Sequence, residues 1–178
     1  MKKTILCFTL LAGLHMGASA EPMHPAMAAT AAVPAVAGQP APNDGEAIDF
    51  TLTDLAGKPF TLSSLKGKYV VVDFWGSWCI NCIKGFPKMK EYYQKHRGRL
   101  EIVSVDCNDS EARWKAAVQK HGMPWVNVYN PRGDGDLAKK LGITAFPTKL
   151  LVDPEGKVVK TFVGEDDSFY TVLDATVK

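Results

Sequence analysis

The sequence predicts a domain of the α/β class, with a mixed central sheet flanked by helices. An apolar run, 69–74, precedes a stretch with helical periodicity that begins after Cys79, and a second apolar run follows at 100–105. One helix of that length joins two strands as a right-handed β-α-β unit, in which the strands are parallel. Further along, Asp153-Pro154-Glu155-Gly156 predicts a turn between two more strands, 149–152 and 158–162.

The first 20 residues have the features of an export signal. Lys2 and Lys3 precede an apolar run that ends near Leu14, and Ala18-Ser19-Ala20 offers the small residues that signal peptidases require. The apolar run is too short for a convincing membrane span, so a retained anchor is the less favoured alternative. We therefore expect export, to the periplasm, with cleavage of residues 1–20.

The remaining chain divides by composition into a linker and one domain. Residues 21–45 are mostly Ala and Pro without apolar periodicity and predict a flexible tether, which leaves 46–178 as the folded domain. Without residues 1–20 the chain has 19 basic and 19 acidic residues. The basic residues are scattered and form no stripe with interleaved aromatics, so we expect no nucleic-acid partner.

The other elements follow from the order of apolar and turn residues within the domain. Ile48, Phe50 and Leu52 alternate with polar neighbours as in a strand. Pro87 is expected to kink the helix that follows Cys79. The pattern also predicts a strand at 60–62, one helical turn at 63–67, helices at 111–121, 136–141 and 167–177, and a strand at 125–128.

Cys79 and Cys82 form a Cys-x-x-Cys pair at the point where a strand gives way to a helix N-terminus. Backbone N–H groups and the helix dipole favour negative charge there, which promotes the thiolate that attacks disulfides. The pattern therefore indicates a redox centre. Half of a zinc site is the alternative, but four ligands are needed and the sequence has no second Cys-x-x-Cys or close His pair, so we expect no metal and no cofactor.

Several motifs in a fixed order resemble the thioredoxin superfamily and, within it, thioredoxin-like proteins of the TlpA/ResA type. The match runs from about residue 46 to 164, and it implies a thioredoxin-like fold with an N-terminal strand extension and a central insertion at about 109–130. The motifs that carry it are Asp49-Phe50-Thr51-Leu52, Gly57-Lys58, Leu65-Lys66-Gly67, Asp73-Phe74-Trp75, Trp78-Cys79-Ile80-Asn81-Cys82, Gly142-Ile143-Thr144-Ala145-Phe146-Pro147-Thr148 and Asp153-Pro154-Glu155-Gly156.

The resemblance implies a role for each residue of the redox centre. Cys79 would be the exposed nucleophile and Cys82 the more buried resolving thiol. Asp73 stands where thioredoxins have a buried acid, which could carry the proton of the second thiol. TlpA/ResA-type proteins often have an acid three residues after the second cysteine, and here that position is Gly85. This departure leaves any acid–base role to Asp73 or to water.

The resemblance also implies a substrate-binding surface beside the cysteines. Pro147 matches the family's cis-proline, which faces the cysteines, and the backbone at Phe146 would pair with an extended substrate segment. Trp78 is expected to pack around the site. Cys107 is expected to be a buried, inert thiol, with a role as a third redox cysteine as the alternative. The histidines that flank helices, His96 and His121, are expected to be solvated.

These features together predict a thiol-disulfide oxidoreductase that exchanges disulfides with protein substrates. The resemblance implies a reductant, served by a membrane electron donor, as in cytochrome c maturation. One alternative is a peroxiredoxin-like peroxidase, but that chemistry uses a Thr or Ser three residues before the reactive cysteine, where this chain has Gly76. The other alternative is a copper carrier, which would require wider cysteine spacing and a distal His.

Overall fold

A computed structural model of the chain describes residues 41–178, and the predicted export signal and most of the predicted linker lie outside these described residues. The described part contains a seven-stranded sheet with the order β2-β1-β5-β4-β3-β6-β7. Its strands are β1 (Thr51–Asp54), β2 (Pro59–Thr61), β3 (Tyr69–Trp75), β4 (Leu100–Asp106), β5 (Val126–Tyr129), β6 (Thr148–Val152) and β7 (Val158–Val163). The helices are α1 (Ile80–Lys95), α2 (Glu111–His121), α3 (Leu137–Lys140) and α4 (Asp167–Thr176), with short 3-10 turns η1 (Leu62–Leu65) and η2 (Gly133–Gly135).

The strand directions confirm the predicted mixed sheet. β3, β4 and β5 are parallel, whereas β6 is antiparallel to β3 and β7 is antiparallel to β6. The β1–β2 hairpin pairs antiparallel with β5 at one side of the sheet and is the predicted N-terminal extension. Helix α2 and strand β5 form the predicted central insertion. The fold class and the β-α-β unit of β3, α1 and β4 are therefore as expected.

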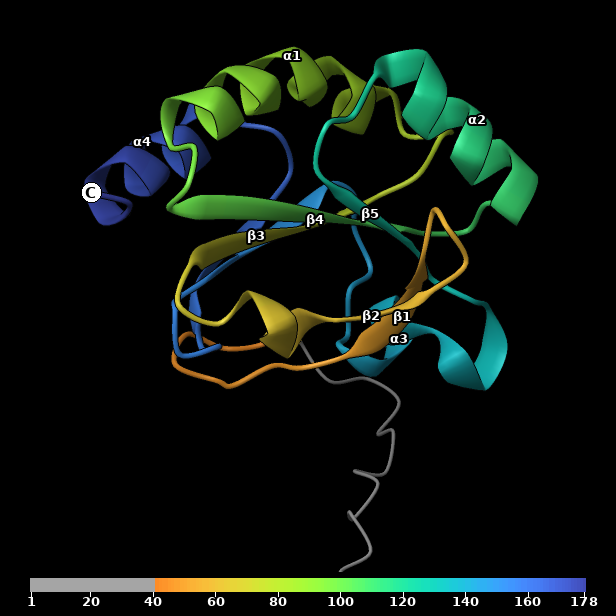
Figure 1. Ribbon diagram of the computed structural model, residues 1–178, viewed down its shortest axis with the longest axis horizontal. Coiled ribbons are helices and arrows are strands. Elements are labelled where there is room, and N and C mark those ends of the chain that lie inside the picture. The colour runs from red at the N-terminus through yellow and green to blue at the C-terminus, as the bar shows by residue number, and fades with distance from the viewer. Residues whose placement is uncertain (1–40) are drawn as a thin grey trace, which may run out of the picture. The chain divides into compact units, whose positions relative to one another are not determined.

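Helices α1, α2 and α4 cover one face of the sheet, and α3 lies with η1 on the other face (Figure 1). Side chains alternate between the two faces along each strand. In β3, Val71 and Trp75 pack into the apolar core under α1, α2 and α4, whereas Val70, Val72 and Phe74 pack into the core on the opposite face. By the same alternation Asp73 belongs to the face that α1 covers, which places it in the layer of the cysteine pair.

Helix α1 runs through Pro87 to Lys95 as one element, and the kink expected at Pro87 stays a prediction. One detail differs from the sequence-based expectation. His96, expected to be solvated, is buried, and its Nε2 lies 2.7 Å from Oδ1 of Asp174. That expectation was wrong because α4, which supplies Asp174, packs over the end of α1. In residues 41–178 no helix is both long and apolar enough to cross a membrane.

Candidate active site

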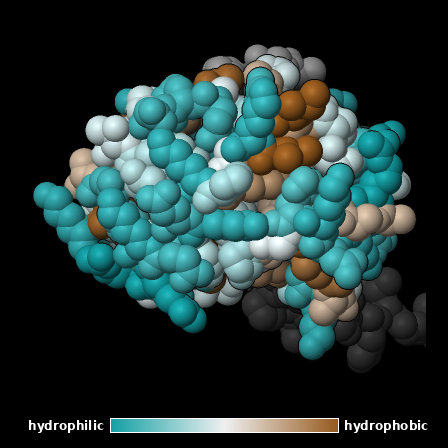
Figure 2. Space-filling model, turned by 90° about the horizontal axis from the view of Figure 1, so that it is seen from above, coloured by the Kyte–Doolittle hydropathy of each residue, from teal (hydrophilic) through white to brown (hydrophobic). Residues whose placement is uncertain are grey.

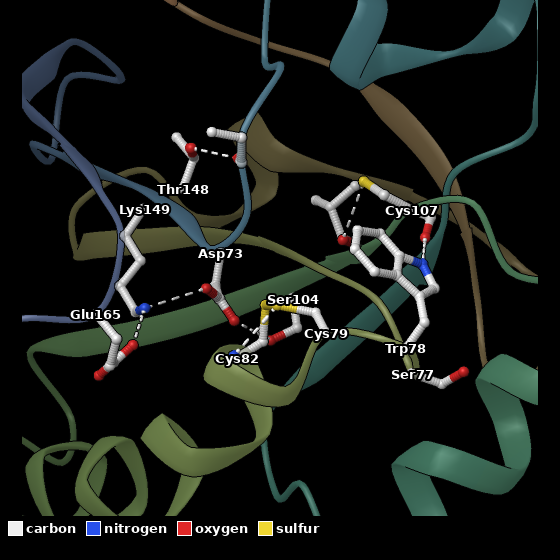
Figure 3. Close-up of a disulfide and its surroundings, with 12 residues drawn as sticks. Asp73, Ser77, Trp78, Cys79, Cys82, Ser104, Cys107, Thr148, Lys149 and Glu165 are labelled. Atoms are coloured by element: carbon white, nitrogen blue, oxygen red, sulfur yellow. Dashed lines mark hydrogen bonds and ion pairs between the residues drawn. A yellow bond between two sulfur atoms is a disulfide. The ribbon is translucent and has the colours of Figure 1, made fainter.

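The two predicted redox cysteines are joined by a disulfide at the start of α1 (Figure 3). Cys79 is the N-cap residue of α1, and its Sγ accepts a hydrogen bond from the backbone N–H of Cys82 at 3.2 Å. Cys79 is 6% exposed and Cys82 2%, so Cys79 is the more accessible sulfur although both are buried. An N-cap position provides backbone donors that stabilise a thiolate. The start of α1 therefore directs a backbone donor at the Sγ of Cys79.

An apolar rim, made of Trp78, Ile80 and Phe146, lies beside the disulfide. The Trp78 ring, 44% exposed, packs edge-on against Phe146 with 5.3 Å between ring centroids, and its Nε1 donates to the backbone oxygen of Cys107 at 3.0 Å. Ile80, 68% exposed, immediately follows Cys79. The Phe146–Pro147 peptide bond is cis. The structure thus brings the three residues expected to bind substrate, one from the cysteine loop and two from the loop before β6, to the same site.

The backbone of Gly76 lies flush against the Trp78 ring. A Cβ at this position would lie 2.4 Å from Nε1 of Trp78 and 2.7 Å from the backbone oxygen of Cys107. Real Cβ atoms do not approach so closely, so a Thr or Ser would displace the indole. The chain therefore lacks the Thr or Ser that a peroxiredoxin-like peroxidase uses at this position, and the structure leaves no room for such a side chain.

A buried aspartate that sequence reasoning missed fixes the loop before Cys79. Asp109 accepts hydrogen bonds from the backbone N–H of Ser77 at 2.6 Å and from its hydroxyl at 2.7 Å, and Nε of Arg113 lies 3.4 Å away. In the sequence Asp109 stands just before the N-cap of α2, Ser110, where an acid is ordinary. Its hydrogen-bond partner, Ser77, lies 32 residues earlier in the chain, and a local sequence pattern cannot reveal such a contact.

Asp73 is 1% exposed and lies in a row of polar side chains across the sheet. Its neighbours on the adjoining strands are Ser104 and Lys149. The Ser104 hydroxyl donates to Oδ2 at 3.5 Å, and Nζ of Lys149 lies 3.7 Å from Oδ1. Burial raises the pKa of the Asp73 carboxyl, and the Lys149 ammonium opposes this shift. A carboxyl group with a raised pKa can exchange protons nearer to neutral pH than an ordinary aspartate.

Other candidate residues are placed more simply. Cys107 is free and buried, and burial raises the pKa of its thiol, as expected of an inert cysteine. Within residues 41–178 no three His, Cys, Asp or Glu side chains are grouped so that they could hold a metal ion. Lys149 and Glu165, which lie beside Asp73, were not among the residues singled out from the sequence.

Comparison with known proteins places this geometry in a family. Residues 67–158 match the family model described as thioredoxin-like. ResA of Bacillus thuringiensis, a thiol-disulfide oxidoreductase, is 36% identical over 121 residues, which are 67% of this chain and 69% of the relative. ResA of Bacillus subtilis is 35% identical over 130 residues, 72% of each chain.

Solved structures agree with the sequence comparison. The thioredoxin domain of a Bacteroides vulgatus thiol-disulfide oxidoreductase superposes with a TM-score of 0.69 at 33% identity, covering 76% of this chain and 99% of that one. A thiol:disulfide interchange protein from Bacteroides gives a TM-score of 0.68 at 31% identity, with 77% and 91% of the two chains covered. The chain belongs to the thioredoxin-like family and is a thiol-disulfide oxidoreductase of the ResA type.

Proposed function

We propose that this oxidoreductase reduces disulfides in exported proteins, with Cys79 as nucleophile and Cys82 as resolving thiol. The Cys79 thiolate attacks one sulfur of the substrate disulfide, forms a mixed disulfide and releases the other sulfur as a thiolate that takes up a proton. The Cys82 thiolate then attacks Sγ of Cys79, which breaks the mixed disulfide and releases the second substrate thiol. The protein ends with the Cys79–Cys82 disulfide, and the substrate has gained two electrons and two protons.

The observation that carries this proposal is the position of Cys79 as N-cap of α1, with its Sγ accepting the Cys82 N–H at 3.2 Å. The same N–H and the helix dipole would stabilise a thiolate on Cys79 once the disulfide is reduced. Cys82 lies deeper, inside the first turn of α1, and has to lose its proton before it can attack. Asp73, on the sheet face below α1, is the carboxylate proposed to accept that proton.

Substrates are proposed to bind as extended segments against Trp78, Phe146 and Pro147. The part of the structure in residues 41–178 exposes four large apolar side chains, and two of them, Trp78 and Ile80, flank Cys79. The surface above the helices is mainly hydrophilic, with apolar atoms in a few separate areas (Figure 2). An apolar rim around a disulfide suits a partner that presents an unfolded, partly apolar segment, and the backbone near Phe146 could add strand-like hydrogen bonds.

Replacing Trp78 with alanine is expected to lower kcat/KM for reduction of a protein disulfide such as that of insulin by about tenfold, because an interface aromatic contributes ~1.4 kcal/mol or more. Reduction of a small aromatic disulfide should change much less, since that substrate does not cover the rim. Leu55→Ala, which removes an exposed apolar side chain in the turn after β1, is the matched control. Equal losses with both substrates would contradict a role for Trp78 in binding protein segments.

The direction of electron flow is proposed to be reducing, with apocytochrome c cysteines as a substrate class and a membrane protein as electron donor. The N-terminal sequence supports the exported location, and the resemblance to TlpA/ResA-type proteins supports the reducing direction. Equilibrating the Cys79–Cys82 couple with dithiothreitol or glutathione and following tryptophan fluorescence gives its reduction potential. A value near or below about −270 mV, that of thioredoxin, is expected, whereas a value near about −120 mV would mean an oxidant and overturn the reducing direction.

A further inference from the structure

Three ionisable side chains lie together beneath the first turns of α1, the helix that carries the proposed resolving cysteine. Nζ of the buried Lys149 is 2.6 Å from Oε2 of Glu165 and 3.7 Å from Oδ1 of Asp73. Lys149 therefore makes a hydrogen-bonded ion pair with Glu165 and only a looser ionic contact with Asp73. Figure 3 shows the three side chains meeting at the Lys149 ammonium, with the disulfide on the far side of Asp73 in this view. A buried charge is costly unless an opposite charge lies beside it, so it matters which of the two carboxylates pairs with Lys149.

Glu165 reaches this position because α1 has no side chain at Gly85, three residues after Cys82. A Cβ on Gly85 would lie 2.6 Å from the carboxyl carbon of Glu165 and 2.6 Å from Oε2. The carboxylate thus occupies the space in which a side chain on α1 would begin. The Tyr170 hydroxyl donates to Oε1 at 2.9 Å and fixes the carboxylate from the side of α4. The β7–α4 loop therefore supplies a carboxylate at a place where the helix itself has none.

We propose that Glu165 is a positioning residue for disulfide exchange: its carboxylate holds the Lys149 ammonium away from Asp73, so that Asp73 remains free to accept the proton of the Cys82 thiol. This inference rests on the proposed function of the cysteine pair. In the step concerned, the Cys82 proton passes to the Asp73 carboxylate, the new thiolate attacks Sγ of Cys79, and the substrate leaves as a thiolate. Glu165 exchanges no atoms or electrons in this step.

The electrostatics around Asp73 agree with this arrangement. Burial raises the pKa of the Asp73 carboxyl, Lys149 lowers it, and the Glu165 carboxylate raises it. The side chain of Glu165 is 21% exposed, so its charge is partly solvated while that of Asp73 is not. The groups that face this cluster are Ser104 from β4, Lys149 from β6, Glu165 and Asp166 from the β7–α4 loop, Tyr170 from α4 and the cysteine pair from α1.

Glu165→Gln keeps the shape of the side chain and removes its charge, which tests the proposal directly. Lys149 would then turn to Asp73 as its remaining anionic partner, and the Asp73 carboxylate would become a weaker base. Reduced protein mixed with an aromatic disulfide that releases a coloured thiol gives two phases, attack by Cys79 and then resolution by Cys82. We expect the pH midpoint of the second phase to move about one unit lower and its plateau rate to fall about threefold, with the first phase unchanged.

Two further variants separate positioning from general effects. Asp167→Asn removes a charge from an exposed side chain two residues away, which pairs with Lys88 at the surface, and should leave both phases unchanged. Gly85→Glu combined with Glu165→Ala moves the carboxylate onto α1, because a glutamate carboxyl carbon lies two bonds beyond the Cβ and spans a gap similar to the 2.6 Å found here. This double variant should restore the midpoint and the rate.

An unchanged second-phase pH profile in Glu165→Gln would overturn the inference. So would a folded double variant that behaves like Glu165→Ala alone, with folding checked by circular dichroism. If the double variant does not fold, the comparison of Glu165→Gln with Asp167→Asn still decides the question. Failure of the proposed function has a different signature, because wild-type protein would then show no second phase or would leave insulin disulfides intact.

Discussion

Replacing Cys79 with serine will abolish disulfide reduction, and replacing Cys82 with serine will stop the reaction at the mixed disulfide. A serine hydroxyl at position 79 is not ionised by the helix N-terminus at neutral pH and cannot attack a disulfide. With Cys82 removed, the Cys79 thiolate can still attack, but no second thiol releases the product. In the two-phase assay, Cys79→Ser should release no coloured thiol, and Cys82→Ser should release one equivalent where wild type releases two.

Cys107→Ala provides the matched control for this pair of variants. Cys107 is buried on the face of the sheet away from α1, and burial raises the pKa of its thiol. Both phases should therefore persist in this variant. Non-reducing electrophoresis of Cys82→Ser with a protein substrate should show a covalent complex that dithiothreitol removes. A complex formed by Cys79→Ser as well, or one lost when Cys107→Ala is added to Cys82→Ser, would assign the nucleophile to a different cysteine.

The parts of this protein that could be predicted from sequence are those specified by local pattern. Helix α2 was expected at 111–121 and is found at Glu111–His121, because Ser110 caps it and its apolar residues recur at helical spacing. Strands β6 and β7 were found through the turn sequence between them. The cysteine pair was located because a buried strand, a Cys-x-x-Cys and a helix follow one another directly along the chain.

The parts that could not be predicted depend on which distant segments become neighbours. Lys149 opens a predicted strand and resembles an ordinary residue at a strand end, yet the pairing of β6 with β3 places it opposite Asp73 in the buried layer. Glu165 lies in a loop without periodicity, so nothing in its surroundings indicated a buried ion pair. The sequence has Gly85 where TlpA/ResA-type proteins often have an acid, and the space that this glycine leaves is filled by a carboxylate from another element.

Replacing Asp73 with asparagine is expected to slow the second phase by about 10²-fold while the first phase changes little, because only resolution by Cys82 requires this base. Lys149 keeps its 2.6 Å partner Glu165 in this variant, so no unpaired ammonium is created. The acid limb of the second-phase pH profile should also disappear, since asparagine does not titrate. A second phase that keeps its rate and its pH dependence would exclude Asp73 as the proton acceptor.

The same substitution should change stability in a direction fixed by the raised pKa of Asp73. The folded state retains the Asp73 proton at pH values where the unfolded state has lost it, so the free energy of unfolding falls as pH rises above the ordinary aspartate pKa. Asp73→Asn should remove this loss. Its free energy of unfolding in urea should therefore exceed that of wild type by a margin that grows from acidic to neutral pH.

Asp106 is a matched control, because burial raises its pKa to about 8 while its carboxyl faces Asp109. Asp106→Asn should show the same stability trend with both reaction phases intact, which separates the catalytic role of Asp73 from the cost of burying a carboxylate.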